Sequence, residues 1–408
     1  MTRSGAKTPF VAIACGGTGG HLFPGLAVAG ELKKRGCRIA LLISPKEIDQ
    51  QAVNAAADMD VFTLPAVGLQ NRNYVSFAAS FVKSLFAARK IFRRCKPEAV
   101  LAMGGFTSAP PVLVAKELGA KTFLHESNTI PGRANRFLAR FVDEAFVGFP
   151  ETATRLKVRN VATTGTPVRP QFDYEKLTVG DRQSAIETRR VALGLEPSRP
   201  TVLVMGGSQG ASGINELILT ALPLLADRRS TWQWLHLTGT AQFEKVKRAY
   251  AEHGLKAVVQ PFLAGMDLAL GAANVAISRS GASSLAEIAA LRLPSLLIPF
   301  PAAADNHQFH NARAFESTGA ARLLEQKNAT PEGVAALLRE LIENEAVRAS
   351  MQAALARWHA PRAAEEIAEN ILNTCWSSSF SLPKENRLKS ELQPPRSTEP
   401  KQEHVCAA

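Results

Sequence analysis

Two glycine-rich segments of this 408-residue sequence have the composition of loops that hold anionic groups. The first spans residues 16–20 and is followed by His21, and the second spans residues 206–211. Each follows a short apolar run and precedes a stretch with helical spacing, so the N–H groups of a helix N-terminus can face an anion. Neither completes a GxGxxG fingerprint or a P-loop Gly-Lys-Ser/Thr, which argues against hydride transfer and ATP hydrolysis. Tight packing of a strand on a helix is the alternative purpose of these glycines.

A third segment, residues 278–287, places small and hydroxyl-bearing residues where a strand is expected to end and a helix to begin. The hydroxyls of Ser283 and Ser284 can add to the backbone donors that would meet a diphosphate. Glu287, one turn further on, can accept hydrogen bonds from a ribose diol, or it can serve only as a capping carboxylate. The polar residues 305–308 follow another strand end and suit sugar hydroxyls.

Alternating strand and helix patterns are expected to position these segments, and they predict an α/β fold with parallel sheets and right-handed crossovers. The strand-like runs are residues 10–14, 38–43, 61–64, 99–103, 122–125, 145–147, 161–164, 201–205, 232–237, 257–260, 275–278 and 295–299. The segments at 26–35 and 213–225 have helical length and spacing. Because the strand, glycine loop and helix occur in both halves, we expect two Rossmann-like doubly wound domains facing each other across a cleft.

Changes in composition predict the domain limits. Two prolines within residues 165–170 separate an N-terminal domain, residues 1–168, from a C-terminal domain, residues 169–350. Residues 351–375 are expected to form a helical segment that packs back on the N-terminal domain. Residues 376–408 are rich in Ser, Pro, Lys and Glu, which predicts a disordered tail.

The overall composition is that of a globular protein, with 46% hydrophobic and 21% charged residues. No run of about 18 apolar residues and no secretory signal is evident, so a cytoplasmic protein is expected. The five cysteines form no CxxC pair and are interpreted as reduced structural thiols. No His, Cys or carboxylate cluster predicts a metal site, and the single DxD, at residues 58–60, is interpreted as a solvated strand entry.

Charge is unevenly distributed between the two halves of the chain. Residues 1–168 hold 22 Lys and Arg against 11 Asp and Glu, whereas the remaining residues are nearly balanced. Within residues 77–96, apolar side chains recur at helical spacing among basic ones, as in helices that lie on anionic bilayers. The stripe consists of Phe77, Phe81, Leu85, Ala88 and Phe92. It can equally well face the core, but the basic excess favours a membrane surface. The sequence lacks a recognition helix or an aromatic platform for nucleic acid.

Taken in order, seven segments resemble the motifs of the MurG family, the N-acetylglucosaminyltransferases of peptidoglycan synthesis in glycosyltransferase family 28. They are residues 16–21, 104–106, 125–128, 165–169, 206–211, 280–287 and 305–308. The resemblance covers about residues 8–375. It implies a GT-B enzyme that moves GlcNAc from UDP-GlcNAc, with inversion, to the C4 hydroxyl of the muramyl sugar of undecaprenyl-pyrophosphoryl-MurNAc-pentapeptide. A UDP-sugar 2-epimerase of the same architecture is the alternative, although it would not need a basic apolar helix.

The resemblance also implies partners and a place in the cell. No cofactor is expected, because the helix start at Ala282 can stabilise the departing diphosphate without a metal. The enzyme would lie peripherally on the cytoplasmic face of the inner membrane, bound to an anionic membrane surface. Its lipid-linked muramyl-pentapeptide acceptor would be presented there, and cell-wall synthesis proteins are candidate partners.

Site residues follow from the same resemblance. Contacts with UDP are assigned to Ser208, Leu263, Ala282, Ser283, Ser284, Leu285, Ala286 and Glu287, with Glu287 on the ribose. The sugar and acceptor side is assigned to Thr18, Gly19, Gly20, Asn128 and Gln308, and the hinge to Arg169. His21 is the expected general base, since a neutral imidazole can accept a proton near pH 7. A helix-capping or substrate-orienting histidine is the alternative, with an Asp or Glu elsewhere as the base.

Overall fold

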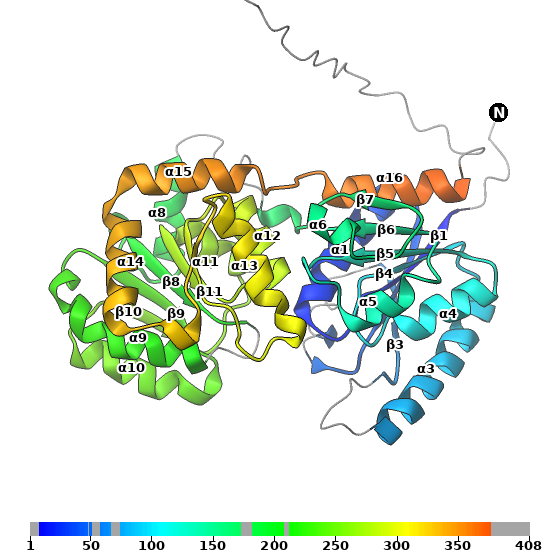
Figure 1. The fold of residues 1–408 in the computed structure, drawn as a ribbon, viewed down its shortest axis with the longest axis horizontal. Coiled ribbons are helices and arrows are strands. Elements are labelled where there is room, and N and C mark those ends of the chain that lie inside the picture. Colours follow the sequence, from blue (N-terminus) through cyan, green and yellow to red (C-terminus); the bar gives the residue numbers. More distant parts are fainter. Residues whose placement is uncertain are drawn as a thin grey trace, which may run out of the picture.

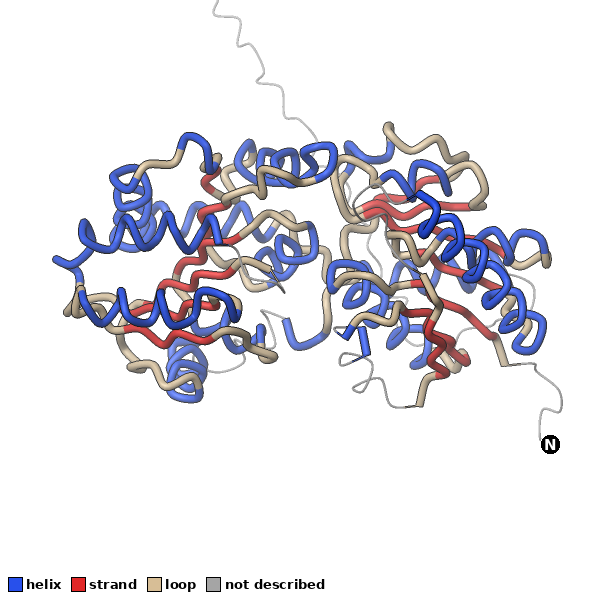
Figure 2. The backbone as a smooth tube through the Cα atoms, turned by 90° about the horizontal axis from the view of Figure 1, so that it is seen from below, coloured by secondary structure: helices blue, strands red, loops and turns tan. Residues whose placement is uncertain are grey.

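The computed structural model describes residues 8–47, 49–50, 58–66, 74–172, 182–207 and 212–376. Two α/β halves lie end to end, each built on its own sheet (Figure 1). Every strand pair within the described residues is parallel, and helices cover both faces of each sheet (Figure 2). The expected α/β fold with two Rossmann-like halves is confirmed.

The first sheet has seven strands in the order β3-β2-β1-β4-β5-β6-β7. They are β1 (Phe10–Ala14), β2 (Arg38–Ile43), β3 (Asp60–Thr63), β4 (Ala99–Ala102), β5 (Lys121–Glu126), β6 (Glu144–Val147) and β7 (Val161–Thr163). Its helices are α1 (Gly19–Lys34), α3 (Tyr74–Cys95), α4 (Ala109–Glu117), α5 (Arg133–Leu138) and α6 (Pro150–Ala153). The strand order reverses between β1 and β4, and loops at such a switch point form a crevice at the carboxyl ends of the strands.

The second sheet has six strands in the order β10-β9-β8-β11-β12-β13. They are β8 (Thr201–Met205), β9 (Gln233–Leu237), β10 (Ala257–Gln260), β11 (Val275–Ser278), β12 (Ser295–Leu297) and β13 (Arg322–Leu323). Its helices are α8 (Arg182–Ala192), α9 (Ser212–Leu225), α10 (Phe243–Glu252), α11 (Met266–Ala272), α12 (Ala282–Ala290), α13 (His307–Ser317), α14 (Pro331–Glu343) and α15 (Glu345–Ala356). The sequence did not predict β13, because two residues carry no periodic pattern.

Strands in both sheets are apolar on both faces because both faces are covered. In β1, Val11 and Ile13 pack with α1 on one side, whereas Ala12 and Ala14 join Phe92 of α3 on the other. This two-sided burial explains why the strands read as short continuous apolar runs.

The chain returns to the first half at its C-terminal end. Met351 and Leu355 of α15 belong to the core of the second half, whereas Ile367 and Ile371 of α16 (Ala363–Trp376) lie in the core beside α1. The segment between α15 and α16 therefore forms a second connection between the halves (Figure 1). The predicted tail beyond Trp376 lies outside the described residues.

Helix α3 corrects the interpretation of the apolar stripe. Ala88 and Phe92 are buried, and Phe81 and Leu85 pack against the same core, so most of the stripe faces the protein. The large exposed apolar residues lie on another face of α3. They are Val75, Val82 and Phe86, at spacings of seven and four residues that share one helix face.

Candidate functional site

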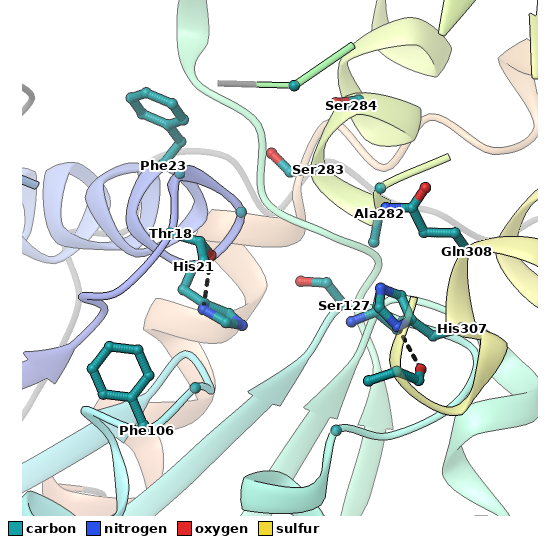
Figure 3. Close-up of a pocket in the computed structure, with 18 of the residues that line it drawn as sticks. Thr18, His21, Phe23, Phe106, Ser127, Ala282, Ser283, Ser284, His307 and Gln308 are labelled. Carbon is teal, nitrogen blue, oxygen red and sulfur yellow. Dashed lines mark hydrogen bonds between the residues drawn. The ribbon is translucent and has the colours of Figure 1, made fainter. Parts of the chain in front are cut away.

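A cavity of about 1580 Å³ lies between the two halves. Loops at the carboxyl ends of strands in both sheets line it, as expected for open α/β folds. In Figure 3, Thr18 and His21 face Ala282, Ser283, Gln308 and His307 across this space. Residues of distant parts of the chain thus meet in one cleft.

The first glycine loop is held from behind by a buried carboxylate. Asp49 Oδ2 accepts hydrogen bonds from the backbone N–H of Gly17 (2.7 Å) and of Ser44 (3.0 Å). Gly16 has no room for a side chain, since a Cβ there would lie 2.3 Å from the Ser44 nitrogen. Helix α1 begins inside the predicted loop, at Gly19, and His21 is therefore its third residue. The carboxylate fixes the loop from which the helix starts.

His21 is placed at the cleft wall by short-range contacts. Its Nδ1 lies 3.1 Å from Thr18 Oγ1 (Figure 3). The ring packs on the backbone of Gly104 and Gly105, where a Cβ on Gly105 would lie 3.0 Å from Nδ1. Desolvation lowers the pKa of His21 to about 4, against an opposing effect of the Asp49 charge. The imidazole is therefore neutral near pH 7 and free to accept a proton.

The start of α12 offers unpaired backbone donors to the same cavity. Ala282, Ser283 and Ser284 form its first turn and line the cleft, and no side chain caps the helix. A helix N-terminus of this kind attracts an anionic group. Leu285 points instead into the core of the second half, so only its backbone can serve a ligand.

Glu287 lies one turn along α12 and lines the cavity. Its Oε1 is 3.6 Å from Arg169 Nη2. Burial raises the pKa of Glu287 to about 7, and the Arg169 charge opposes that rise. The Arg169 guanidinium also lies 4.1 Å from the centre of the Phe23 ring on α1. Arg169 thus contacts both halves at the connection between them.

The structure brings most of the predicted site residues together. The following line the one cavity: Thr18, Gly19, Gly20, His21, Asn128, Arg169, Leu263, Ala282, Ser283, Ser284, Glu287 and Gln308. Ala286 is half-buried on α12, and Ser208 lies outside the described residues. The two acids of the DxD, Asp58 and Asp60, pair with Lys33 and Arg38. Among the described residues, no group of three or more His, Cys, Asp or Glu is arranged to hold a metal ion.

Sequence reasoning missed a buried carboxylate beside Asn128. Glu126, at the end of β5, accepts hydrogen bonds from Asn128 N (2.8 Å), Asn128 Nδ2 (3.0 Å) and Gly132 N (2.8 Å). Asn135 Nδ2 donates to it as well, at 2.8 Å. A carboxylate at the end of the apolar strand β5 was the signal in the sequence that could have pointed to Glu126. The sequence does not show which hydrogen-bond donors meet that carboxylate. His307, which lines the opposite wall, was noted only as part of a polar cluster.

Comparison with known proteins gives consistent matches over the chain. Residues 11–147 match the glycosyltransferase family 28 N-terminal domain, and residues 201–367 match the glycosyltransferase family 28 C-terminal domain. A relative from Anaeromyxobacter sp. (strain Fw109-5) is 36% identical over 374 residues, which cover 90% of this chain and 94% of that protein. A relative from Listeria monocytogenes is 34% identical and covers 89% and 99%. Both are named UDP-N-acetylglucosamine--N-acetylmuramyl-(pentapeptide) pyrophosphoryl-undecaprenol N-acetylglucosamine transferase.

Solved structures share the architecture. The crystal structure of Acinetobacter baumannii MurG has a TM-score of 0.69 at 26% identity and covers 90% of this chain and 100% of that one. A UDP-GlcNAc 2-epimerase from Neisseria meningitidis, bound to UDP-GlcNAc, has a TM-score of 0.66 at 14% identity, with coverage of 90% and 100%. The epimerase match shows the fold alone.

Proposed function

This chain belongs to the MurG family of glycosyltransferase family 28, and we propose that it transfers GlcNAc from UDP-GlcNAc to the muramyl sugar of undecaprenyl-pyrophosphoryl-MurNAc-pentapeptide. One observation carries the proposal. The uncapped start of α12 lies across the cleft from His21, and Glu287 lines the same cleft one turn further along α12. The epimerase alternative has less support, since relatives at 33%, 34% and 36% identity carry the name of the transferase, whereas the epimerase structure matches at 14% identity.

The donor would bind mainly to the second half. The N–H groups at Ala282–Ser284 suit the diphosphate, whose charge grows as the bond to the sugar breaks. Glu287 is placed to accept hydrogen bonds from the ribose diol, and Leu263 lines the same side of the cleft. Because these donors are already in position, they stabilise the leaving group without reorganising.

The acceptor would bind mainly to the first half. In the inverting reaction the C4 hydroxyl attacks C1 from the face opposite the departing UDP, and His21 would take the hydroxyl proton. A base with a pKa near 4 holds a proton weakly, so an anionic neighbour would strengthen it. The acceptor's own pyrophosphate is such a neighbour. Thr18, Gly19 and Gly20 would hold it beside the imidazole.

Peripheral attachment to an anionic membrane completes the proposal. Val75, Val82 and Phe86 form an exposed apolar face on α3, with the exposed basic residues Lys83, Lys90, Arg93 and Arg94 nearby in the helix. Arg89 is paired with Glu117, so its charge is partly neutralised within the protein. In the described part of the chain, no helix has both the length and the apolar character to cross a bilayer. We place the α3 face on the cytoplasmic side of the inner membrane, where the acceptor lipid would be reached.

The deciding experiment is a transfer assay with purified protein. UDP-GlcNAc and the lipid-linked muramyl acceptor in anionic vesicles should yield UDP and a disaccharide-lipid in equal amounts. Release of UDP without the disaccharide would overturn the transferase assignment. Conversion of UDP-GlcNAc to its 2-epimer, without any acceptor, would establish the alternative.

A further inference from the structure

A buried amide joins the two halves of the cleft at a point that no motif marks. Asn311 lies on α13, one turn beyond Gln308, and its side chain has no exposed surface. Its Oδ1 accepts hydrogen bonds from Thr129 N and Thr129 Oγ1, both at 2.9 Å. Its Nδ2 donates to Asn128 Oδ1 (3.0 Å) and to the Ser280 carbonyl (3.1 Å). All four hydrogen-bonding positions of the amide are therefore occupied.

The orientation of these amides is set by chemistry. The Glu126 carboxylate accepts hydrogen bonds, so the Nδ2 of Asn128 must face it and the Oδ1 must face away. That Oδ1 accepts a hydrogen bond from the Nδ2 of Asn311. The N–H of Thr129 requires the Oδ1 of Asn311 on the other side. Hydrogen bonds thus run outward from the Asn311 amide, on one side to the Ser280 carbonyl and on the other through Asn128 to Glu126.

The two ends of this series of hydrogen bonds lie on opposite walls of the cleft. Asn128 follows β5 in the first half and lines the cavity. Ser280 precedes Gly281 and the open N-terminus of α12 in the second half, and its Oγ donates to the carbonyl of Gln308 (2.7 Å). Other contacts between the halves, such as that of Arg136 with Asp305, are more exposed. Exposed ion pairs constrain geometry weakly, whereas a buried and fully satisfied network does so strongly.

We propose that Asn311 is a positioning residue that orients the Asn128 amide and ties it to the turn before α12, so that acceptor and donor are held in line. This inference rests on the proposed function, which puts the acceptor at Asn128 and the diphosphate at α12. With its Oδ1 committed to Asn311 and one Nδ2 hydrogen to Glu126, Asn128 can offer its second Nδ2 hydrogen to a sugar oxygen. Loss of the Asn311 side chain would leave the Asn128 amide without a fixed orientation. It would also remove the hydrogen bonds that hold the two walls of the cleft together.

The test compares steady-state constants of six variants with the parent in the transfer assay. Asn311→Asp keeps the side-chain volume and the acceptor for Thr129, but it loses both donors. Asn311→Ala removes the whole link. Misplacement of reacting groups by about 1 Å costs about 100-fold in rate, so turnover should fall about 10- to 100-fold in both variants. The Michaelis constant for UDP-GlcNAc and the affinity for UDP measured by calorimetry should change less than about threefold. The reason is that the proposed contacts with the sugar nucleotide remain.

Four further variants separate positioning from stability. Gln233→Ala removes an equally buried amide whose bonds, to Glu196, Arg199 and Thr201, stay within the second half and away from the cleft. It should lower the unfolding temperature as Asn311→Ala does and leave turnover unchanged. Thr129→Val removes one of the four bonds to Asn311 and should give a smaller loss of turnover. Asn311→Ala should lower turnover much less when it is added to Asn128→Ala than when it is made in the parent.

Each outcome decides the inference. Parent-like turnover in Asn311→Asp, or equal losses in Asn311→Ala and Gln233→Ala, would leave Asn311 a merely structural role. A raised Michaelis constant for UDP-GlcNAc with unchanged turnover would make it a binding residue and would also overturn the inference. Failure of the parent to form the disaccharide-lipid would refute the proposed function instead, so the two failures are distinguishable.

Discussion

The two halves of this protein share one architecture but present opposite chemistry to the cleft. In the first half, the loop after β1 is held by the buried Asp49 carboxylate and carries an imidazole. In the second half, no carboxylate among the described residues accepts from the N–H groups of the turn after β11, and these groups face the cleft. The same strand-to-helix turn therefore serves as a platform for a base in one case and as an anion site in the other. What occupies the backbone N–H groups decides which role a glycine-rich turn can take.

Burial acts on the titratable groups of both halves in the same sense. It lowers the pKa of His21 to about 4 and raises that of Glu287 to about 7, so each neutral form is favoured. The consequences differ, because the neutral imidazole has its nitrogen unprotonated but accepts a proton only weakly, whereas a neutral carboxyl is a poorer partner for a diol. The base of the first half thus depends on an anionic group of the substrate to raise its pKa, and the second half depends on pH for binding.

The largest expected effect is on the first half. In His21→Ala, turnover should fall about 10²- to 10⁴-fold, because a positioned general base typically contributes that much. Binding of UDP-GlcNAc should stay near the parent value, since its contacts are proposed in the second half. Steady-state kinetics and calorimetry measure the two effects separately. Near-normal turnover at saturating substrates would remove His21 as the base and reduce the contrast between the halves.

Charge reversal on α3 tests whether the basic excess of the first half serves a membrane. Lys90, Arg93 and Arg94 are exposed and should each contribute about 1 kcal/mol near an anionic surface. Replacing all three with Glu should weaken vesicle binding about 100-fold at low salt, and less at high salt. Sedimentation with anionic vesicles measures this. Arg89→Glu is the matched control. Because Arg89 already pairs with Glu117, this variant should lose less vesicle binding. Equal binding by the triple variant and the parent would exclude α3 as the docking surface.

A change at Glu287 should affect binding more than chemistry. Loss of a charge-assisted hydrogen bond costs about 1.5–3 kcal/mol, so Glu287→Ala should raise the Michaelis constant for UDP-GlcNAc about 10- to 150-fold. Turnover at saturation should fall much less. Both constants come from one initial-rate series. An unchanged Michaelis constant would assign Glu287 to helix capping and weaken the contrast with His21.

The smallest expected effect is a pH dependence confined to the donor side. The raised pKa of Glu287 means that its carboxyl gains charge as pH rises through about 7. If the ionised form binds the ribose diol, UDP affinity should rise several-fold between about pH 6 and pH 8 and then level off. Calorimetry with UDP over this range tests the sign, and Glu287→Gln should remove the dependence. Affinity that falls with rising pH would contradict the proposed role of Glu287.

Much of the fold and of the site could be predicted from local patterns. Twelve predicted strands correspond to β1–β12, often to the residue, because buried parallel strands appear as short apolar runs bounded by glycine and proline. Two of the three small-residue turns, those before α1 and α12, lie where the composition predicted them, whereas residues 208–211 of the third lie outside the described residues. The alternation of strands and helices was enough to predict where those turns lie, since ligands meet α/β sheets at the carboxyl ends of their strands.

Local patterns failed where a contact crosses the chain. The α3 stripe has the spacing of a membrane helix, yet Phe92 and Ala88 face the core because α4 and the sheet pack there. Glu126 lies in the motif at residues 125–128 but was assigned no role there, and Asn311 lies in no motif; the importance of both follows from donors elsewhere in the chain.

The sequence by itself determined the two α/β halves, the glycine turns and the family, because these depend on periodicity and on residue types at fixed spacing. Tertiary structure decided which face of α3 is exposed, which turn is open to an anion and which titratable groups are neutral. It also joined Asn128 to Asn311 across the cleft. Burial, desolvation and hydrogen bonding between distant residues are properties of the packed chain, and no single stretch of sequence contains them.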